Sequence, residues 1–305
     1  MTVLDVTFLG TTAGIPTPKR NHAAIYLRYQ SQNEYAYLFD CGEGTQRQLF
    51  IAKLNFFRIN DIFITHWHAD HCAGLLGLLE TMNLEGRKKP LRIFGPEAER
   101  FVDLFTEIGY STKDFDITGV DVPHEGSAVT PLVENDEFMI ASIPVKHHIP
   151  AVAYGFIEKD RLRIDTQKAK KFGLPEKGLV YKHLKKTGVI EFKGKTIHAD
   201  EICDRGTGKK VIYTGDTMPC PNIASFAANA DLLIHDSTFF TESLEKEYRH
   251  STVADVLGIA AKANAKQVVL THISRRYQDT QELKKMIAGH EHVKLAKDFM
   301  TITLT

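Results

Sequence analysis

Short apolar runs, each bounded by polar or glycine-containing segments, alternate along the chain and predict a mixed α/β fold. In the N-terminal third, this pattern predicts helices and strands; the helices cover residues 42–54 and 75–82, and the strands cover residues 3–9, 23–29, 35–39, 61–65 and 91–94. In the last hundred residues we expect strands over 210–214, 231–235 and 267–271, with an amphipathic helix over 252–263 that Ser251 would cap. Because strands alternate with helices, the helices are expected to cover the sheet faces. The two halves are alike in plan, which suits two packed sheets related by pseudo-symmetry.

The composition is that of a folded globular protein. The 305 residues are 43% hydrophobic and 25% charged, which excludes a disordered or fibrous chain. No apolar run approaches the roughly 20 residues of a membrane span, and the first residues lack the pattern of a signal peptide. The four cysteines form no CxxC pair, so neither a disulfide framework nor a thiolate zinc site is indicated. We therefore expect a soluble cytoplasmic protein without a membrane partner.

Charge is balanced over the whole chain but concentrated in one segment. Lys and Arg number 38, as do Asp and Glu, so the net charge is zero. Residues 159–195, however, hold twelve Lys or Arg against four Asp or Glu, a net charge of +8. Apolar periodicity is poor there, and the segment is interrupted by Gly173, Pro175, Gly178, Gly188 and Gly194. This pattern predicts a protruding basic arm, although charge alone favours a solvated insertion with many lysines.

A cluster of metal-ligating residue types directly follows the predicted strand at 61–65. His66, His68, Asp70 and His71 form an HxHxDH motif within six residues. Neutral imidazole and carboxylate are the ligands that zinc and its first-row neighbours prefer. Because four such donors follow a buried strand, the motif predicts a metal site.

Three other predicted strands end in further ligand types. His147 and His148 follow the apolar run 138–145, Asp216 follows 210–214, and His272 follows 267–271. With one of the two adjacent histidines, they bring the number of donor residues to seven. A single catalytic zinc uses about three protein ligands, so seven donors suit two metals with one bridging carboxylate. Two-metal sites are typical of phosphoester hydrolysis.

Several stretches together resemble one known family. Besides HxHxDH they are FLGT at 8–11, FDCGEGTQ at 39–46, YTGDT at 213–217, HST at 250–252 and LTHISRRY at 270–277. The combination is similar to the ribonuclease Z family of the metallo-β-lactamase superfamily, over essentially the whole chain. The resemblance implies an αββα sandwich with two Zn²⁺ per subunit between the sheets. It also implies a zinc-dependent endoribonuclease that removes the 3′ trailer from precursor tRNA, leaving a tRNA 3′-hydroxyl and a 5′-phosphorylated trailer.

The resemblance also assigns the ligands. It implies that the first zinc is held by His66, His68, His147 and Asp216, and that the second is held by Asp70, His71, Asp216 and His272, with Asp216 bridging. His147 is preferred to His148 because the family has a tyrosine seven residues after its ligand histidine, and Tyr154 stands there.

Three residues receive further roles from the same resemblance. Asp70 is expected to accept a proton from the attacking water, and His250 to donate one to the leaving 3′ oxygen. Asp236 is expected to orient a ligand or His250.

The basic arm matches the family's tRNA-binding exosite. We expect a catalytic domain over 1–157 and 209–305, with the flexible arm inserted at 158–208. The expected substrate-binding residues of the arm are Lys168, Lys170, Lys171, Lys177, Lys182, Lys185 and Lys186. Lys19 and Arg20 lie in a loop similar to one that the family places near the tRNA 3′ end. The length is that of the family's short forms, which are homodimers.

Two other functions are compatible with parts of this pattern. A small-molecule hydrolase of the same superfamily, such as a lactonase, thioesterase or arylsulfatase, would share the metals but have no use for a basic arm. A non-catalytic RNA-binding relative would have lost ligands, whereas this chain has the full set. Deleting residues 168–186 would separate the first alternative from the nuclease.

Overall fold

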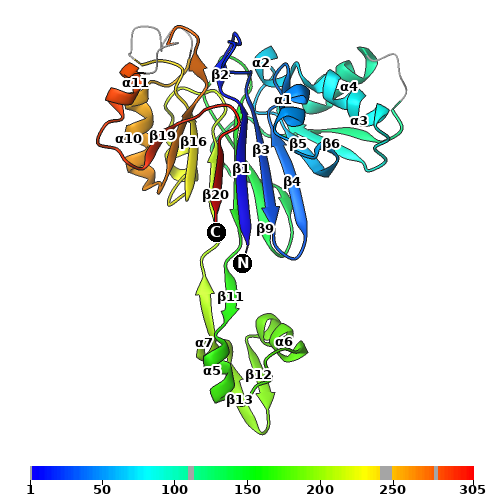
Figure 1. Ribbon diagram of the computed structural model, residues 1–305, viewed down its shortest axis with the longest axis vertical. Coiled ribbons are helices and arrows are strands. Elements are labelled where there is room, and N and C mark those ends of the chain that lie inside the picture. The colour runs from blue at the N-terminus through cyan, green and yellow to red at the C-terminus, as the bar shows by residue number, and fades with distance from the viewer. Residues whose placement is uncertain (1, 109–112, 241–248, 278–280) are drawn as a thin grey trace.

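Two β-sheets pack face to face, and helices cover both outer faces (Figure 1). The computed structural model describes residues 2–108, 113–240, 249–277 and 281–305. The predicted αββα sandwich is confirmed. Within these described ranges, no helix has the length and apolar character needed to cross a membrane.

The first sheet has seven strands in the order β20-β1-β3-β4-β5-β6-β7. Their bounds are β1 Val3–Gly10, β3 Ala24–Gln30, β4 Glu34–Phe39, β5 Ile59–Phe63, β6 Leu91–Gly95, β7 Ile117–Asp121 and β20 Thr301–Leu304. The pairs from β4 to β7 are parallel, and the others are antiparallel. The helices that follow its strands are α1 Thr45–Ile51, a 3₁₀ turn Phe56–Arg58, α2 Ala69–Cys72, α3 Leu75–Leu84 and α4 Ala98–Ile108.

The second sheet also has seven strands, in the order β19-β17-β16-β15-β10-β9-β8. Their bounds are β8 Thr130–Glu134, β9 Phe138–Pro144, β10 Val152–Glu158, β15 Lys210–Tyr213, β16 Leu232–Asp236, β17 Val268–Thr271 and β19 Val293–Leu295. The pairs from β15 to β19 are parallel. The helices are α8 Pro221–Phe226, α10 Val253–Ala263 and α11 Gln281–Met286, and a small pair joins β2 Thr12–Ala13 to β18 Ile273–Ser274.

Successive side chains along a strand point to opposite faces of its sheet, so they contribute to two different apolar cores. In β1, Leu4, Val6 and Phe8 face the space between the sheets, whereas Leu9 packs under the helices of the first sheet. Aromatic rings fill much of the inter-sheet core; the Phe63 ring, for example, lies 5.3 Å from that of Tyr154. The central strands of each sheet are therefore buried on both faces, which fixes the strand ends that carry the metal-ligand types.

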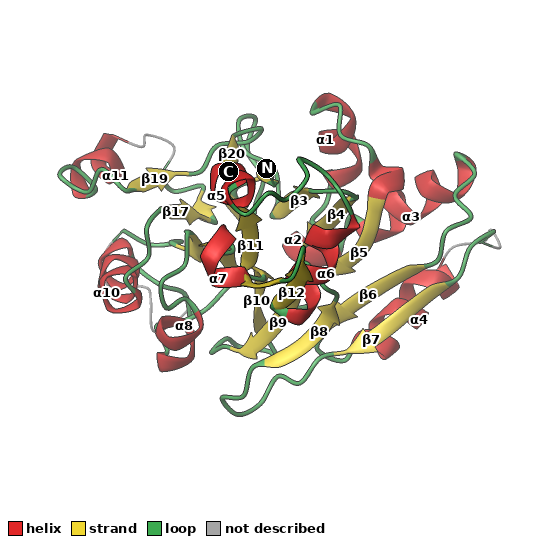
Figure 2. Cartoon of the chain, turned by 90° about the horizontal axis from the view of Figure 1, so that it is seen from below, coloured by secondary structure: helices red, strands yellow, loops and turns green. Residues whose placement is uncertain are grey.

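The basic segment forms a separate projection below the sandwich (Figure 1). Its stem pairs β11 Arg161–Ile164 with β14 Cys203–Gly206, and its tip holds α5 Thr166–Lys171, α6 Leu179–Thr187, β12 Val189–Phe192, β13 Lys195–His198 and α7 Ala199–Ile202. Figure 2, seen from below, shows the helices of this tip in front of the sheets. Leu174, Leu184, Ile190 and Ile197 form part of a small apolar cluster. The sequence pattern was too irregular to predict this local order.

The expected strands are present, but the helix predicted over 42–54 covers only Thr45–Ile51, and the N-cap of α10 was predicted wrongly. Thr252, not Ser251, caps α10: its hydroxyl accepts from the Asp255 backbone, and the Asp255 carboxylate accepts from the Thr252 backbone. The Ser251 hydroxyl instead donates to the carbonyl of Thr217, at 2.7 Å. Ser251 therefore joins the start of α10 to the loop that carries Asp216.

Candidate metal centre

The predicted ligands gather at one edge of the sandwich, where strands from both sheets end. His66, His68, Asp70 and His71 follow β5, whereas the other three donors follow β9, β15 and β17. Because the carboxyl ends of parallel strands share an edge, residues two hundred positions apart are brought together. Five of the seven are buried, namely His66, His71, His147, Asp216 and His272.

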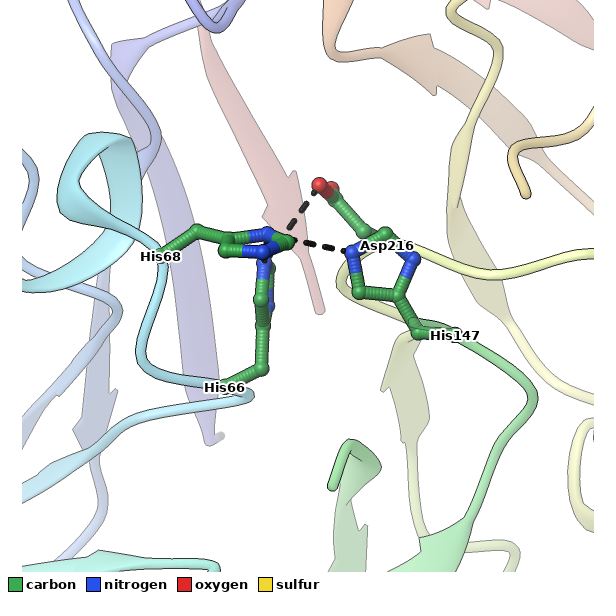
Figure 3. A group of neighbouring side chains, drawn as sticks. All are labelled: His66, His68, His147 and Asp216. Atoms are coloured by element: carbon green, nitrogen blue, oxygen red, sulfur yellow. Dashed lines mark hydrogen bonds and ion pairs between the residues drawn. The ribbon is translucent and has the colours of Figure 1, made fainter. Parts of the chain in front are cut away.

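A first group joins His66, His68, His147 and Asp216 (Figure 3). His68 Nδ1 lies 3.0 Å from His66 Nε2 and 3.2 Å from His147 Nε2. Asp216 Oδ2 lies 3.6 Å from His66 Nε2. The structure thus brings His147 into the group, while the neighbouring His148 is exposed and outside it.

A second group joins Asp70, His71, Asp216 and His272. The Nε2 atoms of His71 and His272 lie 3.2 Å apart, and each is 3.3 Å from Asp216 Oδ1. Asp70 Oδ2 is 3.3 Å from His272 Nε2. Asp216 therefore turns one oxygen to each group, the arrangement expected of a bridging carboxylate.

The geometry of both groups fits a small cation. Zinc binds imidazole nitrogen at about 2.0–2.1 Å, and tetrahedral coordination then separates two ligand nitrogens by about 3.3 Å. The nitrogen separations in the two groups are 3.0–3.2 Å. Asp216 Oδ1 is moreover buried without a hydrogen bond among the described residues. Burial of such an oxygen is costly unless a cation pairs with it.

Burial and neighbouring charges shift the pKa values of the ligand histidines in opposite directions. Burial lowers the pKa of His66 and takes that of His147 to about 4, so both imidazoles are neutral at pH 7. Burial also acts to lower the pKa of His272, but Asp216 and the other carboxylates outweigh it and raise that pKa to about 10. Without a metal, His272 therefore holds a proton that a cation would displace.

Three of the ligand histidines are oriented by hydrogen bonds at Nδ1. His71 Nδ1 lies 2.7 Å from the Asp40 carboxylate, and His272 Nδ1 lies 2.8 Å from the Thr238 hydroxyl. His147 Nδ1 is 3.2 Å from the carbonyl of Arg249. Such partners fix which ring nitrogen faces a metal. The sequence interpretation missed the role of Asp40, although this residue lies in the FDCGEGTQ stretch.

Two residues at this edge of the sandwich adopt a left-handed backbone conformation. Gly215 has φ of 57°, and a Cβ there would lie 2.6 Å from Thr65. Only glycine allows the turn that directs Asp216 into the centre. His272 adopts a left-handed φ of 58°, which costs about 1–3 kcal/mol in a residue with a side chain.

Of the two expected proton-transfer residues, Asp70 belongs to the second group and His250 adjoins both groups. Asp70 Oδ2 accepts a hydrogen bond of 2.8 Å from the Gly14 backbone, and the Gly14 carbonyl lies 3.1 Å from His22 Nε2. His22 is thus linked to Asp70 through one residue, a connection that the sequence interpretation did not contain.

His250 lies beside both groups. Its Nδ1 is 2.8 Å from Asp236 Oδ2, and its ring centroid is 5.3 Å from those of His147 and His272. The buried Asp236 also accepts from the backbone amides of Thr217 and Thr238. Although Asp216, Asp236, His250 and His272 form a third possible ligand group, the Asp236 oxygens are already engaged.

The basic residues expected to bind substrate are mostly exposed. Lys168 pairs with Asp204 and Lys170 with Glu176, both at 2.9 Å. The other expected arm lysines, all exposed, are Lys171, Lys177, Lys182, Lys185 and Lys186.

In the N-terminal loop, the two expected substrate-binding residues differ. Lys19 is exposed, but Arg20 is turned toward the protein, where its Nη1 donates to the Thr11 hydroxyl and the Ala296 carbonyl. Burial lowers the pKa of Arg20 despite the nearby Asp298. The guanidinium of Arg20 is thus largely committed to holding the loop.

Comparison with known proteins agrees with this architecture. A model described as "Beta-lactamase superfamily domain" matches residues 201–273, and one for the anti-Pycsar protein Apyc1 matches residues 4–106. The metallo-β-lactamase fold protein YhfI from Bacillus subtilis superimposes with a TM-score of 0.68 at 19% identity over the whole of both chains. The fold and the paired His/Asp groups define a hydrolase of the metallo-β-lactamase class with a metal-binding site.

The more similar relatives narrow this class. The ribonuclease Z of Archaeoglobus fulgidus is 39% identical over 99% of this chain and 98% of its own length, and that of Thermococcus onnurineus is 41% identical over 93% and 89%. Human tRNase Z, short form, superimposes with a TM-score of 0.69 at 29% identity over 98% of both chains. The chain belongs to the ribonuclease Z family.

Proposed function

We propose that the chain is a zinc-dependent endoribonuclease that removes the 3′ trailer from precursor tRNA. The products would be a tRNA 3′-hydroxyl and a 5′-phosphorylated trailer. The observation that carries the proposal is the pair of His/Asp groups sharing Asp216, in a chain 37% identical to the ribonuclease Z of Methanosarcina acetivorans over 99% of its length.

Zinc is the proposed metal because the donors are imidazoles and carboxylates at tetrahedral spacing. One ion would be held by His66, His68, His147 and Asp216, and the other by Asp70, His71, Asp216 and His272. When bound, two such ions supply a water of lowered pKa and positive charge at the scissile phosphate.

Asp70 is the proposed acceptor of the proton from the attacking water. The Gly14 amide holds its Oδ2, so the direction of the carboxylate is fixed before substrate arrives. Although burial acts to raise its pKa, His71 and His272 lower that pKa well below the usual range. Asp70 is therefore ionised at neutral pH and able to accept a hydrogen bond from water.

His250 is the proposed donor of the proton to the leaving 3′ oxygen. Asp236 accepts a hydrogen bond from His250 Nδ1–H, which leaves Nε2–H for the substrate. General acid–base catalysis of this kind contributes about 10²–10⁴-fold to a rate. Asp236 acts through His250 and is a positioning residue.

The arm at 158–208 is proposed to bind tRNA, while residues 1–157 and 209–305 form the catalytic domain. Its net charge of +8 over 159–195 supports contact with phosphates, since Lys and Arg release the counterions of a nucleic acid. Lys171, Lys182, Lys185 and Lys186 are exposed on or beside α5 and α6.

We also propose that the protein acts as a homodimer. The arm extends from the end of the sandwich opposite α2, the short helix that carries Asp70 and His71 (Figure 1). An arm so directed is remote from the metal centre of its own chain. In a dimer, the arm of one subunit would hold the tRNA that the other cleaves.

The direct test is cleavage of a 3′-extended precursor tRNA, with mapping of both new ends. We expect one cut near the acceptor end, abolished by a chelator and restored by Zn²⁺. A protein lacking residues 168–186 should lose this cleavage but keep hydrolysis of bis(p-nitrophenyl) phosphate. Equal loss of both activities would contradict the role of the arm, and absence of a chelator-sensitive cut would contradict the function.

A further inference from the structure

A pocket of about 670 Å³ opens beside the metal centre, on the side of His147. Its volume lies within the range of about 300–1,000 Å³ that small-ligand sites span. Ile149, Pro150 and Met218 give it an apolar wall, and Lys146 and Arg249 stand in its lining. None of the proton-transfer or arm residues lines this pocket, so the proposed mechanism leaves it without an occupant.

Lys146 is a cation on a fixed piece of backbone. Its carbonyl accepts from the Met218 amide at 2.8 Å, and its own amide donates to the Thr217 hydroxyl at 3.3 Å. These bonds join the strand end that carries His147 to the loop that carries Asp216. Among the residues that the structure describes, the exposed ammonium of Lys146 is assigned no ion pair with a carboxylate.

Arg249 is held at the same wall by two reciprocal contacts. Its Nη1 donates to the His147 carbonyl at 3.1 Å, and its own carbonyl lies 3.2 Å from His147 Nδ1. The backbone adopts a left-handed φ of 51° at this point. Glu125 is the one acidic residue in the described lining, where His124 and His148 complete the titratable groups. The lining thus favours an anion.

The position of the pocket relative to the proposed proton donor, His250, indicates which anion it binds. In-line displacement at phosphorus puts the attacking water and the leaving oxygen on opposite sides. The proposed mechanism assigns Asp70 to the attacking water and His250 to the leaving oxygen. The leaving 3′ oxygen must therefore face His250, which directly follows Arg249 and whose ring lies 5.3 Å from that of His147. The nucleotide that carries this oxygen must extend toward the pocket.

We propose that this pocket binds the last nucleotide retained by the tRNA, with Lys146 and Arg249 contacting its 5′-phosphate and the apolar wall packing against its sugar and base. This inference rests on the proposed function, because it uses the direction of cleavage. The ligand class is a nucleoside 5′-monophosphate with a free 3′-hydroxyl, which is how the cleavage product ends.

The test is calorimetric titration of the zinc-loaded protein with adenosine 5′-monophosphate and with adenosine. Adenosine 5′-monophosphate should bind, and adenosine should bind at least tenfold more weakly. Lys146→Ala should raise the Kd for the monophosphate about tenfold, since a charge-assisted contact to phosphate is lost. Lys146→Arg should restore binding to within about threefold. Lys88→Ala is the matched control, because Lys88 is an exposed lysine paired with Asp114 outside the pocket.

Equal affinity of Lys146→Ala and the unaltered protein would overturn the proposal, as would equal binding of adenosine and its monophosphate. With precursor tRNA, Lys146→Ala should raise KM several-fold and leave kcat within about twofold. The two proposals fail separately. If Lys146→Ala binds the monophosphate normally but the unaltered protein cleaves precursor tRNA, only the pocket assignment is wrong. If the unaltered protein does not cleave precursor tRNA, the proposed nuclease function is wrong, whatever the titration shows.

Discussion

Replacing Asp40 by asparagine tests whether a residue outside the ligand set controls the metal centre. Asp40 is completely buried and accepts hydrogen bonds from His71 Nδ1, the Tyr213 hydroxyl, the Thr65 amide and the Thr65 hydroxyl, at 2.7–3.0 Å. Asparagine has nearly the same shape and tolerates the left-handed φ of 57° found at this position. The substitution therefore changes charge and hydrogen bonding with little change in packing.

The expected magnitude follows from these contacts. An asparagine NH₂ must face either the Thr65 amide or the side of His71 and Tyr213, so at least one donor meets another donor. Each hydrogen bond to a charged group is worth about 1.5–3 kcal/mol, so the free energy of unfolding should fall by about 2–4 kcal/mol. His71 would also lose the partner that fixes its tautomer, which should lower metal affinity about 10–100-fold.

Zinc affinity is measured by competition with a chromophoric chelator, and stability by denaturant unfolding of the metal-free protein. Asp61→Asn is the matched control, because buried Asp61 lies in β5 and pairs with Arg92 at 2.7 and 2.9 Å. That variant should lose stability but keep its zinc affinity. If Asp40→Asn binds zinc as tightly as the unaltered protein, the role assigned to Asp40 is wrong.

Three other variants probe separate parts of the mechanism. His250→Ala should lower kcat about 10²–10⁴-fold at unchanged zinc content, whereas loss of zinc on elemental analysis would make His250 a ligand. His22→Ala removes the contact to the Gly14 carbonyl and should lower kcat about tenfold through Asp70; unchanged single-turnover rates would refute this link. Reversing three arm charges should weaken tRNA binding and flatten its salt dependence while bis(p-nitrophenyl) phosphate hydrolysis persists, and an unchanged salt slope would count against the arm as the tRNA-binding surface. The arm substitutions are Lys182→Glu, Lys185→Glu and Lys186→Glu.

Several strands could be predicted because short apolar runs become strands that are buried along most of their length. The apolar runs at 3–9 and 61–65 correspond to β1 and β5, whose boundaries differ from the prediction by two residues or fewer. Among the strands of the two large sheets, β7, β8, β10, β19 and β20 were not predicted. β7 and β8 contain no fully buried residue and therefore no clear alternation. The start of α10 was assigned to the wrong residue because both Ser251 and Thr252 are suitable N-caps, and only the tertiary partner of Ser251 distinguishes them.

The ligand types could be recognised from sequence because each follows a predicted strand. His147 and His148 could not be separated by residue chemistry, since adjacent residues point in different directions and only the fold decides which faces the centre. Asp40 contacts His71, which lies 31 positions away in the sequence. His22 reaches Asp70 only through the backbone of Gly14, which lies 56 positions from Asp70. No local spacing encodes such contacts.

The central claim is that seven residues from four strand ends hold two ions that are required for cleavage of precursor tRNA. The most direct measurement strips the protein of metal, adds Zn²⁺ in fractions of an equivalent, and records both bound zinc and cleavage of a 3′-extended precursor. We expect no cleavage without metal and a rise that saturates at two equivalents per chain. Full cleavage by the stripped protein, or saturation of both signals at one equivalent, would contradict the claim.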